Sequence, residues 1–575
     1  MIRLEESFGR ELHSQSFWSR HKKLLFSLGV LGTLGSYQAI TSAQNGASLI
    51  YGAEYQEPSC PKIEAVVPAF EKSVNLILND DEYKKATIER LSGAIQIPTE
   101  IEDVYPSPKE DPDYFKYFYQ FHDYLEKTFP LTYQHLKVEK VNEIGLLYTW
   151  EGSDSSLKPV IFMAHQDVVP VNRRTWDEWE YPPFSGYYDE ETDYIWGRGA
   201  SDCKNLLTAE LEAVEQLIKD GYTPQRTVLV SFGFDEESSG TEGAQQLSQF
   251  IEQRYGEDSI HSIVDEGNGV DFIDDHLAMA APVNAEKGYV DTLITINGHG
   301  GHSSVPPDHT TIGVAAQFIK ELEAHSFKYQ FEPDNPIYQL LTCTAEHSDT
   351  ISPKLKRTIL GASKSHAKKK ELGKFLASHR SWRDLIRTTS AVDIITGGIK
   401  ANALPEVTSF LVNHRIDIHS SVEETLDVDV YYAKKIAKKF GYGVSLNGEY
   451  LVPETELGTI EIIARDSLEP APISPTSGPV WDLFAGTIQN VFENGVFADR
   501  EDVEFYVATH LSSGNTDTRY YWNLTRYIYR FIASLVDSST AGTTHSVNER
   551  IKADRHISAI AFVYQYIVNT GNVRD

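Results

Sequence analysis

The strongest constraint on how this chain folds is a set of acidic and histidine clusters, each directly after a short apolar run. The three clusters are His165-Gln166-Asp167 after residues 159–164, Asp235-Glu236-Glu237 after residues 227–234, and Asp265-Glu266-Gly267 after residues 262–264. Short apolar runs of this kind are typical of strands buried on both faces of a parallel sheet. Because open α/β sheets bind ligands beyond the carboxyl ends of their strands, we expect the clusters to meet at one edge of a sheet.

The spacing of apolar residues predicts two kinds of architecture in one chain. In the first part, a helix over residues 206–220, ending at Gly221, lies between two buried strands, as in α/β folds. From residue 288 the pattern changes to alternating strands and amphipathic helices, at 290–296, 310–324, 409–418, 422–439 and 442–446. This order predicts a small α+β domain inserted into a larger α/β domain, with the Lys-rich segment 348–381 as a local elaboration of the insert.

Each cluster alone has an ordinary structural explanation. His165 and Asp167 can be an incidental pair on one strand face. Asp202 can cap the helix that follows it, and the acids at 235–237 can form a surface turn. His545 stands alone late in the chain and can equally be structural. The competing interpretation is that these side chains are buried together, which would require compensating cations, and two divalent ions would supply them.

Charge and cysteine content exclude several classes of protein. Lys and Arg number 52 against 83 Asp and Glu, and the net charge of −31 would repel phosphate backbones, so no nucleic-acid partner is expected. The three cysteines, Cys60, Cys203 and Cys343, make no disulfide framework, and none belongs to a Cys-x-x-Cys pair. Any metal site must therefore use histidine and carboxylate ligands.

The N-terminal segment predicts attachment to a membrane. A basic stretch at 20–23 precedes an uncharged run at 24–40, which is short for a bilayer span of about 20 residues. One interpretation is a signal peptide cleaved near residues 41–43. We favour an uncleaved signal anchor, because the polar leader is long and its basic residues would stay cytosolic. This predicts a type II protein with a cytosolic tail at 1–23, a transmembrane anchor at 24–40 and a lumenal arm at 41–85.

In their order, the motifs resemble those of the co-catalytic zinc hydrolases, the family that includes aminoacylase, carboxypeptidase G and carboxypeptidase S. The motifs are Ala164-His165-Gln166-Asp167-Val168-Val169-Pro170, Gly199-Ala200-Ser201-Asp202, Asp235-Glu236-Glu237, Asp265-Glu266-Gly267 and Thr544-His545-Ser546. The resemblance begins near residue 85, reaches the C-terminus, and is strongest for carboxypeptidase S-like members. It implies a three-layer α/β/α zinc-peptidase catalytic domain in two parts, 86–287 and 451–575, with an inserted α+β ferredoxin-like lid and dimerisation domain at 288–450.

The resemblance also implies a site that holds two Zn²⁺ ions per subunit. The implied ligands are His165, Asp202, Glu237, Asp265 and His545. Asp202 would bridge the two ions, while His165 and Asp265 would bind opposite ones. Glu266 is the alternative to Asp265, and we favour Asp265 because the resemblance to carboxypeptidase S-like sequences implies the Asp. Glu236, beside the ligand Glu237, would be the general base, and Asp167 would support His165.

Four further residues are implied in substrate binding. His302, in Gly298-His299-Gly300-Gly301-His302-Ser303-Ser304, resembles a lid histidine that reaches an active site, often that of the partner subunit. Asn402 and Arg415 would bind the free carboxylate of a substrate. The alternative interpretation, that Asn402 is a turn residue and Arg415 a surface arginine, is about equally well supported. Gly514 lies in a segment that would line the substrate pocket.

These residues predict a metallo-carboxypeptidase that removes the C-terminal residue of short Gly-X peptides, using a water activated by the zinc ions. One alternative is hydrolysis or synthesis of N-fatty-acyl amino acids by the same site. A second alternative is a non-catalytic membrane receptor on a hydrolase fold. The resemblance implies a vacuole or lysosome-like lumen, where cleavage of the anchor could release the body. Asn523-Leu524-Thr525 is a glycosylation sequon that fits a lumenal body.

Overall fold

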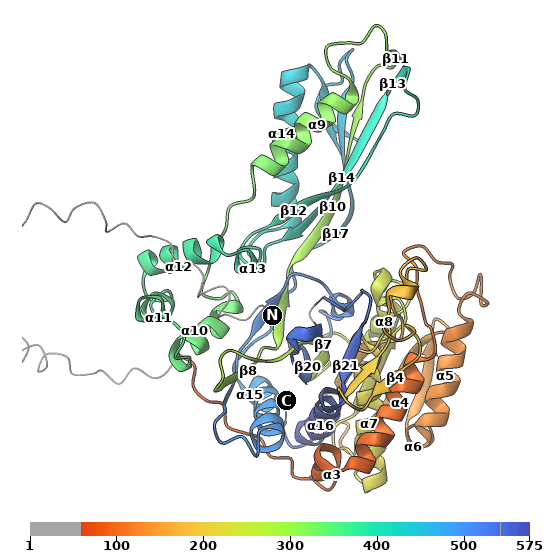
Figure 1. Cartoon of the computed structure of the whole chain (residues 1–575), viewed down its shortest axis with the longest axis vertical. Helices are drawn as coiled ribbons and strands as arrows, with labels where there is room; N and C mark the ends of the chain where they lie inside the picture. Colours follow the sequence, from red (N-terminus) through yellow and green to blue (C-terminus); the bar gives the residue numbers. More distant parts are fainter. Residues whose placement is uncertain (1–58, 541, 575) are drawn as a thin grey trace, which may run out of the picture.

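The structure is a computed structural model that describes residues 59–540 and 542–574. It consists of a large α/β body and a second sheet that projects away from it (Figure 1). The predicted tail and anchor, residues 1–40, lie outside the described residues, as do the first residues of the predicted arm. Among the helices that are described, none is long and apolar enough to cross a membrane.

A mixed ten-stranded sheet forms the centre of the body, with its main strands in the order β1-β2-β6-β3-β7-β20-β9-β19. The strands are β1 (Lys137–Val141), β2 (Gly145–Trp150), β3 (Val160–His165), β6 (Val228–Gly233), β7 (Ser262–Phe272), β8 (Leu277–Ala280), β9 (Val283–Glu286), β18 (Glu504–Val507), β19 (His510–Ser512) and β20 (Ile528–Leu535). The central strands β6, β3, β7 and β20 run parallel, so their carboxyl ends share one edge of the sheet.

Helices cover both faces of this sheet, as the alternation along β3 illustrates. Phe162 packs in one core with α7 (Lys204–Asp220), α15 (Pro479–Val491) and α16 (Ala553–Thr570), whereas Met163 packs in another with α8 (Ala244–Tyr255). On the first face lie also α3 (Val74–Asn79), α4 (Asp81–Ile95), α5 (Lys116–Thr128) and α6 (Pro130–His135). The three-layer α/β/α arrangement confirms the predicted fold class.

The projecting sheet has six strands in the order β12-β14-β10-β17-β15-β16. They are β10 (Gly288–Asn297), β12 (Thr389–Gly397), β14 (Val407–Ile416), β15 (Gly443–Leu446), β16 (Glu449–Val452) and β17 (Thr459–Leu468). One face is covered by α9 (Thr311–Ala324) and α14 (Val422–Phe440), as the regular alternation of buried residues in β10 requires. This is the predicted α+β insert, with two strands more than the ferredoxin-like pattern. The sequence predicts that the insert ends at residue 450. Because β17 pairs with β10, the sheet extends beyond that residue.

The segment between α9 and β12 packs on the body. It contains α10 (Ile337–His347), α11 (Pro353–Leu360), α12 (His366–Ser378) and α13 (Arg380–Arg383). Their apolar faces share a core with residues of β8, β18 and β19, including Met279, Tyr506 and Leu511. The Lys-rich segment is therefore a helical cover for one end of the large sheet, which differs from its predicted place as an elaboration of the lid.

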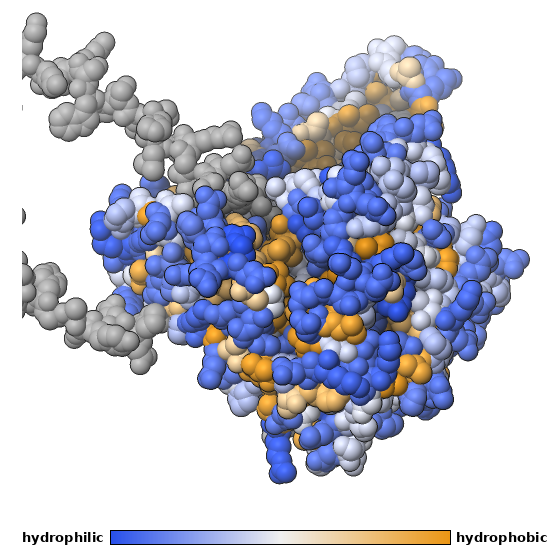
Figure 2. All heavy atoms as spheres, turned by 60° about the horizontal axis from the view of Figure 1, so that its bottom comes forward, coloured by the Kyte–Doolittle hydropathy of each residue, from blue (hydrophilic) through white to orange (hydrophobic). Residues whose placement is uncertain are grey.

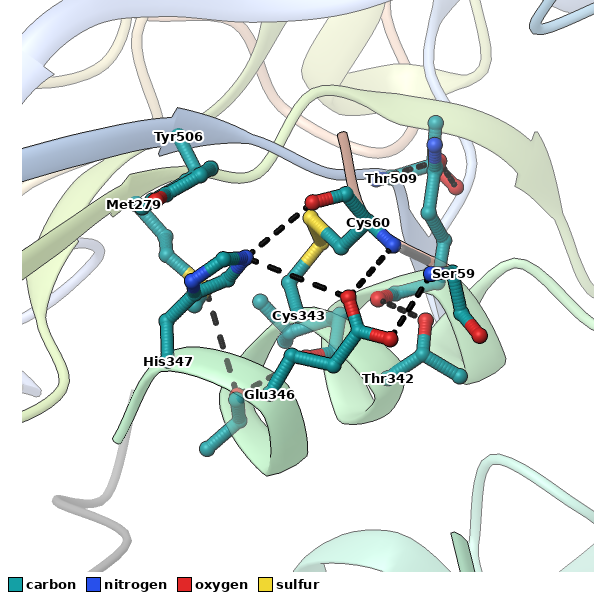
Figure 3. The surroundings of a disulfide bond; sticks show 12 residues. Ser59, Cys60, Met279, Thr342, Cys343, Glu346, His347, Tyr506 and Thr509 are labelled. Carbon is teal, nitrogen blue, oxygen red and sulfur yellow. Dashed lines mark hydrogen bonds and ion pairs between the residues drawn. A yellow bond between two sulfur atoms is a disulfide. The ribbon is translucent and has the colours of Figure 1, made fainter. Parts of the chain in front are cut away.

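The sequence predicts no disulfide framework, but the structure contains one disulfide bond. Cys60 and Cys343 are bonded to each other across 283 positions, and only Cys203 is free. The bond joins the arm in front of α3 to α10. The side chain of Glu346 accepts hydrogen bonds from the backbone N–H groups of Ser59 (2.7 Å) and Cys60 (2.8 Å), and His347 contacts the Cys60 carbonyl (Figure 3). The arm is thus fixed to the body by a covalent bond and by α10 side chains.

Two small sheets support the loops that matter below. β4 (Tyr187–Asp189), β5 (Tyr194–Trp196) and β21 (Arg550–Lys552) form one, which holds the chain before Asp202 against the chain after His545. The other joins β11 (Gly301–His302) to β13 (Ala403–Leu404) at the far tip of the projecting sheet (Figure 1).

Candidate metal centre

The predicted clusters meet at the carboxyl edge of the central strands. His165 is the last residue of β3, and Glu236 and Glu237 form the single turn after β6. Asp202 lies in the loop between β5 and α7, and His545 precedes β21. Ligand atoms of these side chains fall into groups within 4.8 Å of one another, and one group is Asp202, Glu237 and His545. Five motifs spread over nearly 400 positions thus form one site.

Asp202 lies between the two histidines. Its Oδ1 is 3.1 Å from Nε2 of His165, and its Oδ2 is 3.1 Å from Nε2 of His545. Although burial acts in the opposite direction, hydrogen bonds from both imidazoles lower the pKa of Asp202. Asp202 does not cap α7, because Cys203 holds the cap position and no side-chain hydrogen bond caps the helix. The peptide bond that joins Asp202 to Cys203 is cis. A carboxylate with one oxygen toward each imidazole has the geometry of a bridge.

Asp167 holds two parts of the site in place. Its Oδ1 is 3.2 Å from Nδ1 of His165, which leaves Nε2 of that ring directed at Asp202. The same carboxylate accepts hydrogen bonds from the backbone N–H groups of Glu236 (3.3 Å) and Glu237 (3.1 Å). Asp167 is fully buried. It therefore orients both an imidazole and the turn that carries two acids, as carboxylates beside metal-binding histidines do.

The structure places Glu266, and not the favoured Asp265, in the site. Oε1 of Glu266 is 3.7 Å from Nε2 of His165, and the two belong to one potential ligand group. Asp265 is buried, and one of its oxygens has no hydrogen-bond partner among the described residues. The two acids are neighbours in β7, whose side chains alternate between faces, so only one can point to the centre. Asp265, expected as a ligand on the ion opposite to that of His165, is therefore not the acid near the His165 ring, and Glu266 is the acid beside that ring.

Gly267 completes this motif for a steric reason. A Cβ at Gly267 would lie 2.3 Å from the carbonyl oxygen of Arg530 in the neighbouring strand β20. β7 runs on past the Asp-Glu-Gly motif, which sequence patterning places at the end of a short strand. The close approach of β20 explains why the strand continues through a glycine.

The electrostatics of the centre favour bound cations. Hydrogen bonds to Asp202 and Glu237 raise the pKa of His545 to about 10, and burial raises the pKa of Glu237 to about 7. Burial, together with the nearby charge of Glu266, raises the pKa of Glu236 well above its ordinary value. Crowded, partly desolvated carboxylates of this kind need positive charge close by. The donor set of imidazoles and carboxylates fits zinc, so the residues present fit the implied ions.

One important residue, Glu549, was missed by sequence reasoning. Glu549 is buried, and its Oε2 accepts a hydrogen bond from Arg198 at 2.6 Å. Its Oε1 accepts from the backbone N–H groups of Gly199 (2.9 Å) and Ser201 (3.0 Å). Glu549 therefore ties the loop that carries His545 to the loop that carries Asp202. The sequence signal for Glu549 was its position shortly after the candidate ligand His545, in Thr544-His545-Ser546-Val547-Asn548-Glu549.

A cavity of about 970 Å³ opens onto the centre. Arg415 and Gly514 line it together with Asp202, Glu237 and His545. NH1 of Arg415 donates to Oδ1 of Asn515 at 3.3 Å, which fixes the guanidinium beside the Gly514 segment. Arg415 projects from the face of the lid sheet opposite to α9 and α14, so the lid contributes one wall of the cavity.

His302 and Asn402 do not line this cavity. Both are exposed, and they lie together at the tip of the lid, where β11 pairs with β13. The Ser303 N–H donates to the carbonyl of Asn402, and Nδ1 of His302 accepts from the Ser304 N–H at 3.1 Å. The structure therefore separates these two candidates from Arg415 and Gly514 within a single chain (Figure 1).

Comparisons with known proteins agree with this geometry. The pattern of peptidase family M20/M25/M40 matches residues 161–569. The Saccharomyces cerevisiae protein named Carboxypeptidase S is 56% identical over 96% of this chain and 97% of its own length. The Homo sapiens N-fatty-acyl-amino acid synthase/hydrolase PM20D1 is 31% identical over 85% of this chain and 88% of its own length. The M20 family metallo-carboxypeptidase Sso-CP2 from Sulfolobus solfataricus covers 85% of this chain and 99% of its own, with a TM-score of 0.56 and 18% identity.

Proposed function

Because this chain belongs to peptidase family M20/M25/M40, we propose that it is a metallo-carboxypeptidase that removes the C-terminal residue of short peptides, in particular of the Gly-X type. The observation that carries this proposal is that Arg415 and Gly514 line the same cavity as Asp202, Glu237 and His545. A guanidinium that can grip a carboxylate therefore stands beside a centre suited to polarise the adjacent amide. The relative at 56% identity, named Carboxypeptidase S, points to the same activity.

The centre would hold two Zn²⁺ ions. We assign one to His165 and Glu266, the other to Glu237 and His545, and both to Asp202 as the bridge. This assignment rests on the 3.7 Å between His165 and Glu266 and on the grouping of Asp202, Glu237 and His545. When bound, such ions supply a hydroxide near neutral pH by lowering the pKa of a coordinated water.

Glu236 would act as the general base and acid. Its carboxylate belongs to a group within 4.8 Å that also contains His165 and Glu237, so it stands at the centre without being needed as a ligand. Burial raises its pKa, which suits a group that takes a proton from water and then gives it to the leaving amine. Asp167 would keep the Glu236 turn in position through its hydrogen bonds.

His302 and Asn402 would act across a dimer. Their exposed place at the lid tip, away from the centre of their own chain, agrees with a role in the site of a partner subunit. The edge strand β12 of the lid is largely exposed and carries Ile394 and Ile395 on its surface. Figure 2 shows apolar residues on the lid, and others on the body, among largely hydrophilic surroundings. An exposed apolar edge strand is a natural surface for pairing with a second copy.

We further propose that the body lies in the lumen of a vacuole-like compartment, attached through residues 24–40. The Cys60–Cys343 bond supports this, since disulfides persist in oxidising compartments and are rare in the cytosol. Asn523 is exposed, as a glycosylation acceptor must be. Cleavage in the arm before residue 59 would release the body, because Cys60 is already fixed to α10.

Hydrolysis of N-fatty-acyl amino acids is the second candidate. The 31% identity to the human protein named N-fatty-acyl-amino acid synthase/hydrolase PM20D1 favours keeping it. The same centre would cleave either amide, so the difference must come from the acyl side of the cavity. A receptor that lacks catalysis is less well supported, because candidate ligands, the candidate base Glu236 and Arg415 line one cavity.

One experiment tests these functions together. The purified full chain and the Asp202→Ala variant are assayed with Gly-Leu and with an N-fatty-acyl leucine, before and after removal of metal by a chelator. We expect metal-dependent cleavage of Gly-Leu, little cleavage of the acyl substrate, and loss of both metal and activity in the variant. Preference for the acyl substrate would favour the second candidate. A metal-loaded wild type that cleaves neither would refute both enzymatic functions.

A further inference from the structure

A second cavity adjoins the one that opens onto the metal centre. It encloses about 730 Å³ between α13, the segment that follows it, and the base of the lid sheet. Asn413, Arg415 and Gly514 line both cavities, so these three residues form the boundary between them. Any molecule held by Arg415 in the first cavity therefore has the second within reach.

The second cavity is strongly basic. Its charged lining residues are Lys287, Arg380, Arg383, Arg387 and Arg415, against the single acid Asp384. The chain as a whole carries a formal charge of −31, so a concentration of five cations around one acid is contrary to the general charge of the protein. Low-dielectric walls focus such a charge and attract anions into the space between them.

The single acid of the lining, Asp384, neutralises only part of this positive charge. Oδ1 of Asp384 accepts from Nε of Arg383 at 3.1 Å and from NH2 of Arg387 at 3.0 Å, so one carboxylate oxygen is shared by two guanidiniums. Within residues 59–540 and 542–574, the side chain of Arg380 forms no hydrogen bond or ion pair. Positive charge and unused N–H donors therefore remain available to a ligand.

The basic segment is held in a defined position. Lys287 is buried at the start of the lid, and its Nζ donates to the carbonyl oxygens of Asp384 (3.0 Å) and Arg387 (2.8 Å). The backbone of Lys287 in turn accepts from the side chain of Asn515, the residue that also contacts Arg415. The backbone that carries the arginines is thus linked by hydrogen bonds to residues that line the first cavity.

We propose that this second cavity is a subsite for the acidic side chain of a substrate whose C-terminal residue is Asp or Glu. The inference rests on the proposed carboxypeptidase function, in which Arg415 holds the α-carboxylate. The side chain of that residue leaves from the same carbon as the α-carboxylate and can pass the boundary formed by Arg415 and Gly514. A second carboxylate there would meet Arg380, Arg383 and Arg387, which are suited to bidentate contacts.

The test compares Gly-Glu with Gly-Gln, which are nearly equal in size and differ in charge. For metal-loaded full chain we expect kcat/KM to be roughly ten-fold higher for Gly-Glu, as charge-assisted hydrogen bonds imply. The double variant Arg380→Gln/Arg383→Gln should bring this ratio close to one. Asp384→Asn should raise the ratio, because it removes the competing acid. Lys374→Gln, at an exposed lysine of α12 outside the cavity, is the control for the loss of a positive charge elsewhere and should leave the ratio unchanged.

A binding measurement separates this inference from the proposed function. Glutarate, a dicarboxylate without an amide, is titrated into the full chain by calorimetry, and thermal unfolding verifies that each variant is folded. We expect binding that weakens several-fold in the single variant Arg380→Gln and further in the double variant. If neither Gly-Leu nor Gly-Glu is cleaved, the proposed function fails. If Gly-Leu is cleaved but the Gly-Glu to Gly-Gln ratio is near one, or is the same in all variants, the subsite is refuted.

Discussion

Glu549 and Arg198 form an ion pair of 2.6 Å in which both side chains are almost completely buried. The pair lies behind the metal centre and joins two loops that meet only in the folded chain. The other oxygen of Glu549 accepts hydrogen bonds from the backbone N–H groups of Gly199 and Ser201, just before Asp202. The relative position of Asp202 and His545 therefore depends on a residue that is not itself among the candidate metal ligands.

We expect Glu549→Gln to destabilise the fold and to loosen the centre. Removing one partner of a buried ion pair leaves the other charge uncompensated and costs roughly 3–5 kcal/mol. Urea unfolding gives the free energy of unfolding, and elemental analysis gives the metal retained at equal free-metal concentration. Glu501→Gln, on the exposed turn before β18, is the matched control and should stay within about 0.5 kcal/mol of wild type. A variant as stable and as metal-rich as wild type would contradict the role of Glu549.

Asp167→Asn is predicted to weaken metal binding without unfolding the protein. The variant keeps the side-chain volume but loses the charge that orients His165 and that accepts the N–H groups of Glu236 and Glu237. Loss of such a partner typically costs 10–100-fold in metal affinity or activity. Competition with a chelator of known affinity measures the first, and turnover of Gly-Leu at saturating zinc measures the second. Unchanged affinity together with unchanged turnover would show that His165 is oriented by other contacts.

Part of the candidate metal centre could be predicted, because the ends of buried strands can be recognised in the sequence. Buried strands appear as short apolar runs, and a parallel arrangement brings whatever follows them to one edge of the sheet. His165 and Glu237 meet in this way. Asp202 and His545 lie instead in loops next to β5 and β21, so their place in the site was implied only by the resemblance to the zinc hydrolases. The choice between Asp265 and Glu266 could not be made in the same way, because it depends on which face of β7 points to the centre. That face is set by the pairing of β7 with β3 and β20.

Contacts between distant segments were also beyond sequence patterning. The Cys60–Cys343 bond spans 283 positions, and three cysteines alone do not indicate which two approach each other. The helices α10 to α13 would be amphipathic whether they packed on the lid or on the body. Their sequence pattern therefore does not show which of the two they cover. Similarly, β17 alternates like any half-exposed strand, and only its pairing with β10 assigns it to the lid sheet.

Acid sensitivity should depend on His122. This residue is buried in α5, with Nε2 2.9 Å from Oε1 of Gln166, and burial together with the charge of Lys140 lowers the pKa of His122 to about 4 from an ordinary 6.5. Below pH 6.5 the unfolded chain therefore binds a proton that the folded chain does not. The free energy of unfolding should fall between about pH 6.5 and 4, and this one group accounts for at most roughly 3 kcal/mol of that fall.

The variant His122→Asn removes this proton uptake and should make unfolding less dependent on pH. Urea unfolding curves at pH 7.0, 5.5 and 4.5 measure the slope in wild type and variant. His366→Asn, at the exposed start of α12, serves as the control for loss of a histidine. If the slopes of wild type and His122→Asn coincide, the acid sensitivity arises from other groups.

Breaking the Cys60–Cys343 bond should release the arm and lower stability while leaving the metal centre intact. The bond closes a loop of 283 positions, and native disulfides typically contribute about 2–4 kcal/mol by restricting the unfolded chain. We expect Cys343→Ser to lower the free energy of unfolding by this amount and to make the chain near residue 60 accessible to proteases. Glu346→Gln, which weakens the hydrogen bonds to Ser59 and Cys60 and the contact with His347 but keeps the disulfide, should have a smaller effect. Limited proteolysis with N-terminal sequencing locates the cut, and denaturation gives the energy. A Cys343→Ser variant with wild-type stability and an uncut arm would mean that the hydrogen bonds of α10 hold the arm without the disulfide.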